Sequence, residues 1–217
     1  MDYKQWLEKG ELNQEIIKAQ LKITKNRFLK RLEELKIDKD IISIIEKYGY
    51  ISGSYIHSLH NFNHKYEAND IDIWIGPHPN QEKTKKYLRK LLEENISFEA
   101  TNGKSDYGEK NHILVIDGLY QIIFKDFKTP EDRVTEFDFQ NLCNYYVFCY
   151  ESLVTSTVIS CDDLFLNHNG IEFLDPIRFA NRIEKYRQRG FNTFHLLVNL
   201  CKFSIDFLNK KAAEGCE

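Results

Sequence analysis

Two aspartates, Asp70 and Asp72, are separated by one residue in the run Asp-Ile-Asp-Ile. Side chains alternate between the two faces of a β-strand, so both carboxylates project from one face and Ile71 and Ile73 from the other. Adjacent carboxylates repel each other, and a divalent cation bound between them removes that repulsion. The pair therefore predicts a metal-binding strand, while a solvated strand edge is the simpler interpretation of the pattern taken alone.

A Gly-Ser pair, Gly53 and Ser54, precedes the aspartates in the chain. Glycine lets the backbone approach a ligand closely, and a turn that leads into a helix presents backbone N–H groups to phosphate. We expect Ser54 to cap a helix that runs towards Phe62, and both residues to contact the phosphates of a nucleotide. A Gly-Ser pair by itself is usually a plain turn, so this prediction depends on the aspartates that follow it.

A third aspartate, Asp138, lies downstream in the run VTEFDFQN, residues 134–141, which we interpret as a strand. Phe137 and Phe139 would point one way and Asp138 the other. Together with the aspartate pair, Asp138 would hold two Mg²⁺ ions, one on a nucleoside triphosphate and one on an acceptor hydroxyl, and would accept the proton of that hydroxyl. An all-oxygen ligand set favours Mg²⁺ over zinc.

In this order, the Gly-Ser turn, the Asp-x-Asp strand and the later aspartate resemble the motif of the DNA polymerase β-like nucleotidyltransferase superfamily. The resemblance covers roughly residues 41–141, and the runs YQIIF, FDF and RIEKYRQRGF are similar to uncharacterised nucleotidyltransferase-like proteins of large DNA viruses and phages. It implies an α+β fold, with a mixed, mostly antiparallel sheet flanked by helices. It also implies transfer of a nucleoside monophosphate from a triphosphate to a hydroxyl, with release of pyrophosphate.

Basic residues are frequent in the C-terminal run PIRFANRIEKYRQRGF, residues 176–191. The basic residues of this run are Arg178, Arg182, Lys185, Arg187 and Arg189. A solvated basic face is the simple interpretation. The alternative is that Arg182 or Lys185 turns inward and binds a triphosphate or an acceptor phosphate.

The surrounding pattern predicts the elements that position these residues. Apolar residues at helical spacing and helix-end signals predict helices over residues 14–36, 40–47, 81–94, 176–189 and 194–208. Strands are expected over residues 48–52, 70–75, 96–101 and 134–141. Asp117-Gly118 between two β-rich runs predicts a hairpin with a two-residue type I′ turn. Beyond residue 141 the pattern is mostly helical.

The length and composition suit a soluble protein that can bury a hydrophobic core. We interpret the 217 residues as an N-terminal helical extension (1–38), a nucleotidyltransferase core (39–141) and a helical C-terminal part packed on that core (142–217). The net charge of -3 disfavours a protein wholly devoted to nucleic acid and is compatible with a local basic groove. No apolar run is long enough to span a bilayer, and the N-terminus is too polar for a signal peptide, which predicts a cytoplasmic protein, in the host cell if the chain is viral.

The sequence thus predicts an enzyme, an Mg²⁺-dependent nucleotidyltransferase with a nucleoside triphosphate as substrate and an RNA end, a protein or a small molecule as acceptor. The expected catalytic and metal-binding residues are Asp70, Asp72 and Asp138, and the expected nucleotide-binding residues are Gly53, Ser54, Arg182 and Lys185. The alternative is a catalytically silent module of the same fold that binds a nucleotide, a nucleic acid or a partner protein. The sequence specifies neither the nucleobase nor the acceptor nor the oligomeric state.

Overall fold

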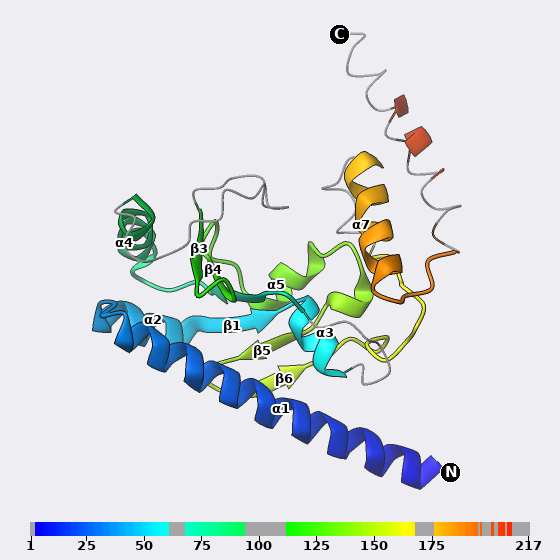
Figure 1. The fold of residues 1–217 in the computed structure, drawn as a ribbon, viewed down its shortest axis with the longest axis horizontal. Helices are drawn as coiled ribbons and strands as arrows, with labels where there is room; N and C mark the ends of the chain where they lie inside the picture. The colour runs from blue at the N-terminus through cyan, green and yellow to red at the C-terminus, as the bar shows by residue number, and fades with distance from the viewer. Residues whose placement is uncertain are drawn as a thin grey trace.

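A computed structural model of the protein describes residues 3–60, 68–93, 112–167, 176–194, 196, 201, 204–206, 208 and 209. In these residues a six-stranded sheet is flanked by helices (Figure 1). This confirms the expected α+β class with a mixed sheet. None of the helices in the described ranges is long and apolar enough to cross a membrane.

The helices are α1 (Tyr3–Glu34), α2 (Lys39–Tyr48), α3 (Ser54–His60), α4 (Gln81–Glu93), α5 (Pro130–Thr135) and α7 (Pro176–Gln188), with a 3₁₀ turn η2 (Gln140–Leu142). The strands are β1 (Gly49–Ser52), β2 (Ile71–Ile75), β3 (Ile113–Ile116), β4 (Tyr120–Ile123), β5 (Tyr145–Val147) and β6 (Ser152–Val154). They lie in the order β3-β4-β2-β1-β5-β6. The β2–β4 pair is parallel, and every other neighbouring pair in this sheet is antiparallel.

One face of the sheet is covered by the long helix α1. Ile51, Ile73 and Ile122 point to this face and share a core with Leu21 and Phe28 of α1. This buried stripe confirms the amphipathic helix predicted from residue 14, although the helix begins much earlier, at Tyr3. In Figure 1, α1 runs along one side of the molecule, and its N-terminal end projects beyond the strands.

The opposite face of the sheet carries the polar residues of interest. Tyr50 and Trp74 are buried there, and the guanidinium carbon of Arg133 in α5 lies 4.0 Å from the centre of the Trp74 ring. Alternation along β2 and β4 places Asp72 and Gln121 on this same face. Both are only partly buried, so this part of the face is open to a ligand.

Helix α1 is fastened to the turn between β5 and β6 by ion pairs. Lys22 Nζ and Lys25 Nζ lie 2.6 and 2.8 Å from the carboxylate oxygens of Glu151. The hydrogen bonds from Lys22 and Lys25 lower the pKa of Glu151 to about 2. The Lys25 side chain is almost fully buried and also donates to the Phe148 carbonyl, 3.3 Å away.

This ion pair predicts an acid-dependent loss of stability. Because the folded chain lowers the pKa of Glu151, the pairing stabilises the fold above the unfolded-state value, and its contribution is lost as the pH falls towards about 2. We therefore expect Glu151→Gln to flatten the pH dependence of the free energy of unfolding, measured by urea denaturation between about pH 5 and pH 2. Glu33→Gln, on the exposed side of α1, is the control, and equal slopes for wild type and Glu151→Gln would contradict the prediction.

The predicted hairpin is present between β3 and β4. Asp117 and Gly118 have φ angles of 54° and 64°, both positive as a type I′ turn requires. Leu119 N donates to the Ile116 carbonyl, and strand pairing resumes between Ile116 and Tyr120. The connection is therefore one residue longer than predicted.

The strand predicted over residues 134–141 is wrong. Its first two residues belong to α5, because Thr129 caps that helix by accepting the Asp132 N–H and Pro130 occupies the first turn. After α5 the chain makes only an isolated bridge, between Phe139 and Leu166, before η2. Thr129 and Pro130 therefore start a helix just before the run in which alternation predicts a strand.

The mostly helical pattern predicted beyond residue 141 is also wrong in part. Strands β5 and β6 form a hairpin there, with Tyr145 paired to Val154 and Val147 to Ser152. Alternation explains the fit, because Tyr145 packs on one face of the sheet and Tyr146 on the other. Helix α7 ends as predicted, with Gly190 at φ 93° just after it. The predicted strand over 96–101 and most of the predicted helix over 194–208 lie outside the described residues.

Candidate functional site

The predicted metal-binding aspartates lie at the start of β2, near the edge of the open sheet face. Asp72 lies within the strand and Asp70 immediately before it, and both are partly exposed. The neighbouring strand β4 contributes Gln121, which is paired with Asp72 in the parallel register. Gln121 Nε2 donates to Asp70 Oδ2 over 3.0 Å. Three oxygen-bearing side chains therefore gather at this point.

The Gly-Ser turn lies directly beside Asp72. Gly53 has a φ angle of 94°, which favours glycine, and a methyl group at this residue would lie 3.8 Å from Asp72 Oδ2. The same methyl group would lie 3.9 Å from the ring of Phe137. The structure thus brings Gly53 and Asp72 together across 18 intervening residues, and Ser54 begins α3 at the same place.

The backbone of the turn is held by Asn144. The Gly53 N–H donates to the Asn144 carbonyl over 3.3 Å, and Ser52 Oγ donates to the same oxygen over 2.6 Å. The Gly53 carbonyl accepts from the His57 N–H over 3.4 Å. The Gly53 amide is therefore engaged within the protein, so a phosphate at this turn would be bound by Ser54 rather than by Gly53.

Two buried asparagines fix the segment that holds the turn. Asn144 donates to the Asn141 carbonyl and accepts from the Ser156 N–H. Asn141 donates to the carbonyls of Val158 and Asp163, each 3.0 Å away. Neither of the two asparagines is among the residues predicted from the sequence, and nor is Gln121. Gln121 has a local signal, a polar residue in the apolar run YQIIF, whereas the asparagines act through long-range contacts that no local pattern shows.

Asp138, the third predicted carboxylate, is buried and bound by Arg182. The Arg182 guanidinium donates from Nε to Asp138 Oδ2 and, over 2.9 Å, from Nη2 to Asp138 Oδ1. Arg182 therefore points inward to a protein carboxylate, and the binding of a phosphate by Arg182 or Lys185 stays a prediction. Burial, and then the charge of Asp138, raises the pKa of the nearby Cys143 to about 12.

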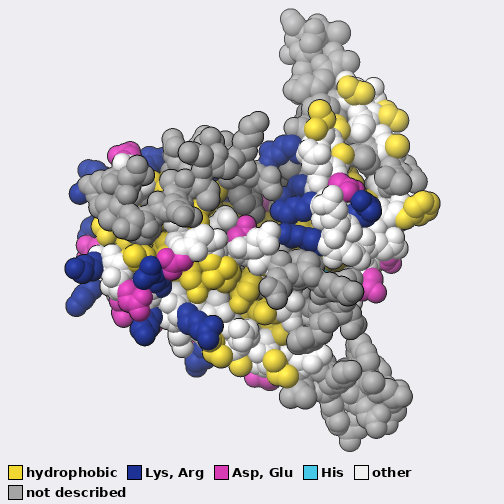
Figure 2. All heavy atoms as spheres, in the orientation of Figure 1, with side chains coloured by type: hydrophobic (Ala, Val, Ile, Leu, Met, Phe, Trp, Pro, Cys, Tyr) yellow, Lys and Arg dark blue, Asp and Glu magenta, His cyan; other side chains and the backbone are white. Residues whose placement is uncertain are grey.

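Basic residues of α7, with Arg189 just after it, form a stripe that includes Arg182 of this ion pair. Arg178, Arg182, Lys185 and Arg189 recur at intervals of three or four residues, so they lie on one side of the helix. Lys185 is exposed and the others are half-buried. Figure 2 shows Lys and Arg side chains gathered over the surface around α7. A phosphate-bearing ligand is the kind of molecule that such a stripe attracts.

Helix α7 and helix α3 lie at the same end of the sheet (Figure 1). The ring of His57 in α3 is buried and lies 4.9 Å, centre to centre, from the ring of Phe191, just beyond α7. Phe137 lies next to Asp138 in the chain and also approaches Gly53. The Arg182–Asp138 pair is therefore close to the turn, although it is not part of the Asp70–Asp72–Gln121 group.

The side-chain oxygens at β2 and β4 are of the kind that a hard cation prefers. Carboxylate and amide oxygens are ligands that Mg²⁺ accepts, and Asp70, Asp72 and Gln121 supply them from one face. A second ion has less support, since both oxygens of Asp138 are bound by Arg182. Across the described parts of the chain, no group of three or more His, Cys, Asp or Glu side chains is placed to hold a metal ion. The role of Asp138 as a ligand stays a prediction.

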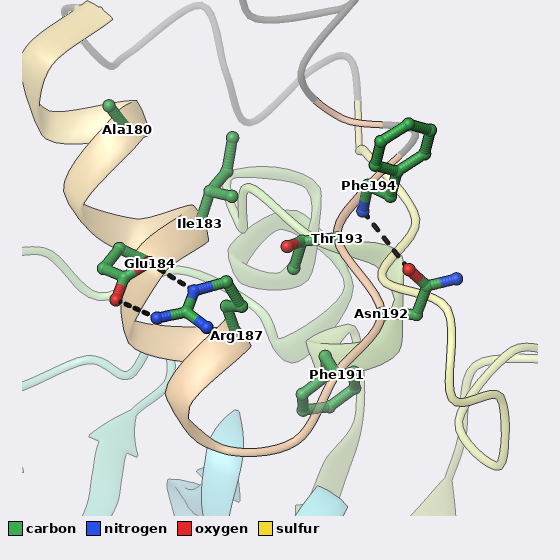
Figure 3. Close-up of a pocket in the computed structure, with 8 residues that line it drawn as sticks. All are labelled: Ala180, Ile183, Glu184, Arg187, Phe191, Asn192, Thr193 and Phe194. Carbon is green, nitrogen blue, oxygen red and sulfur yellow. Dashed lines mark hydrogen bonds and ion pairs between the residues drawn. The ribbon is translucent and has the colours of Figure 1, made fainter.

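A hollow of about 430 Å³ lies on another side of α7 (Figure 3). The residues around it are Ala180, Ile183, Glu184, Arg187, Phe191, Asn192, Thr193 and Phe194. Arg187 is paired with Glu184 at its edge, and Phe194 is largely exposed. None of these residues is among those predicted to bind a nucleotide or a metal.

A family model described as "Gabija anti-defense 2 family protein" matches residues 21–170, more than half of the chain. The match spans the whole sheet and contains Gly53, Asp70, Asp72 and Asp138. No curated protein and no solved structure matches.

The family match overturns the identification with the DNA polymerase β-like nucleotidyltransferase superfamily and its viral members. That identification depended on a few common residue types in a fixed order, with a spacer of free length between them. Such a pattern fits more than one family. The structure also removes one of its parts, because the segment around Asp138 is not a strand.

Proposed function

The chain belongs to the Gabija anti-defense 2 family, and from this premise we propose that it counteracts Gabija defence by metal-dependent nucleotidyl transfer. The observation that supports this chemistry is the closeness of Gly53 to Asp72, whose Oδ2 would lie 3.8 Å from a methyl group at Gly53, with Asp70 bound to Gln121 at the start of the same strand. We also propose that the chain has a nucleotidyltransferase fold, in which this turn and strand bind the nucleotide that donates the transferred group. The chain would act in the cytoplasm of the host cell.

Each residue of the site has a distinct task in the proposed reaction. Asp70 and Asp72 would hold a Mg²⁺ ion, which supplies Lewis-acid stabilisation of phosphate oxygens. The Ser54 hydroxyl and N–H would bind the outer phosphates of the nucleoside triphosphate. Lys185, on the exposed part of the basic stripe, would attract a phosphate-bearing substrate or acceptor.

The transfer itself is an in-line displacement. The acceptor hydroxyl forms a bond to the α-phosphorus, the bond to the bridging oxygen breaks, and pyrophosphate leaves with the electron pair. The hydroxyl proton passes to a carboxylate or to water at the site. Since the protein mainly positions the reactants and offsets charge, the site requires few groups beyond those at β2 and α3.

The second candidate is a binding module without turnover, which inhibits by occupying a Gabija component. The specific observation in its favour is the Arg182–Asp138 ion pair, which occupies the predicted third ligand. Against it, Asp70 and Asp72 both remain partly exposed beside the Gly53 turn, as a cation-dependent reaction would require. The two candidates differ in whether a labelled product forms.

Incubation with nucleoside triphosphates labelled at the α-phosphate, Mg²⁺ and the Gabija components as acceptors tests the proposal. We expect label on one component with wild type and none with Asp70→Asn/Asp72→Asn. Tight nucleotide binding without any transferred label would favour the binding module. Equal labelling by the double variant would contradict the site.

A further inference from the structure

Gln121 is the residue of the candidate site that neither the motif nor the family description assigns. Its side chain is half-buried on the open sheet face and donates from Nε2 to Asp70 Oδ2 over 3.0 Å. The parallel register of β2 and β4 pairs Gln121 with Asp72. Gln121 therefore donates a hydrogen bond to Asp70 and lies beside Asp72 on the neighbouring strand.

We propose that Gln121 is the positioning residue that orients Asp70, so that Asp70 and Asp72 present their carboxylates to a single divalent cation. This inference rests on the proposed metal-dependent function. Asp70 lies before the first residue of β2, so it is outside the residues that pair with β4. A hydrogen bond from the rigid neighbouring strand supplies the orientation that the loop lacks.

An amide suits this task for an electrostatic reason. A third carboxylate beside Asp70 and Asp72 would add repulsion in the absence of a cation, whereas the neutral amide donates to one oxygen of Asp70. The hydrogen bond to one oxygen restricts rotation of the Asp70 carboxylate, and this also restricts where the other oxygen points. The amide group of Gln121 also carries an oxygen, a ligand type that a hard cation accepts.

The sequence of β4 argues against a purely structural role. Tyr120 and Ile122 are buried on the other face, and Ile123 is buried further along the same face. A β-branched or aromatic residue would suit a strand better than glutamine at residue 121 if packing alone mattered. The polar side chain is therefore explained by its contact with Asp70.

Binding of Mg²⁺ alone to the purified full chain tests the inference, with no reaction needed. The dissociation constant is measured by calorimetry, and the thermal midpoint is followed over the same Mg²⁺ titration. We expect Gln121→Leu to weaken Mg²⁺ binding by about 10–100-fold, the usual effect of removing a partner that orients a ligand. Gln188→Leu is the matched control, since Gln188 makes the same kind of bond, over 2.9 Å, to Glu184 on α7.

A second variant separates positioning from simple stabilisation. Gln121→Met keeps the approximate size of the side chain but removes the donor to Asp70, so we expect weakened Mg²⁺ binding with a thermal midpoint close to that of wild type in the absence of Mg²⁺. A purely structural hydrogen bond predicts the reverse, a lower thermal midpoint with unchanged affinity for Mg²⁺. If wild type binds Mg²⁺ and both Gln121 variants bind it equally well, the inference is overturned and the proposed function stands. If wild type shows no Mg²⁺ binding, both are overturned.

Discussion

Asp138→Ala is expected to lower the free energy of unfolding by about 3–5 kcal/mol, the usual result of removing one partner of a buried ion pair. The Asp138 side chain is only 3% exposed and that of Arg182 17%, so the Arg182 guanidinium would lose its carboxylate in a poorly solvated place. The pair joins α7 to the segment that follows α5. Urea denaturation, monitored by circular dichroism, measures the loss.

Two further variants make this prediction specific. Asp138→Leu/Arg182→Met replaces the pair by apolar side chains of similar size and is expected to be much closer to wild type than Asp138→Ala. Glu184→Ala breaks an exposed pair with Arg187 on the same helix and is expected to have no measurable effect. A small loss for Asp138→Ala, similar to that for Glu184→Ala, would show that the pair does not hold α7.

Asp72→Asn is expected to reduce the rate of nucleotidyl transfer by about 1,000-fold, equivalent to ~4 kcal/mol in the transition state. Asp72 is the carboxylate nearest the Gly53 turn, so its loss affects the ion and the phosphate site together. Single-turnover label transfer at saturating nucleotide measures the rate of the chemical step.

Asp40→Asn, on the exposed surface of α2, is the matched control and is expected to react at the wild-type rate. Since the asparagine keeps the size of the side chain, the folded state of Asp72→Asn should remain intact, as circular dichroism would verify. A rate within a few-fold of wild type would show that Asp72 supports the strand and takes no part in the reaction.

Helices α1, α2, α4 and α7 and the hairpin could be predicted because their causes are local. The stripe of Leu21 and Phe28 repeats at the period of a helix, and Asp117-Gly118 supplies the positive φ angles of the turn. Short strands gave a weaker signal. β5 has only three residues, and its aromatic run does not reveal how it pairs with β1.

The site could be predicted only where it depends on residues close together in the chain. The Asp70–Asp72 spacing by itself predicts that both side chains lie on one face, because side chains alternate along a strand. Gln121 joins them through the register of two parallel strands, and Asn144 holds Gly53 from the far side of β1. Asp138 was placed by alternation in a strand that the structure replaces with a helix and a turn.

We propose that the chain counteracts Gabija through the chemistry of Asp70 and Asp72. The most direct measurement of this claim is the survival of Gabija-carrying cells under the challenge that the defence normally blocks, with the wild-type chain or Asp70→Asn/Asp72→Asn expressed at matched levels. We predict that wild type abolishes the protection and that the double variant leaves it intact. Equal loss of protection with both proteins would show that Asp70 and Asp72 are not needed, and would assign the activity to binding alone.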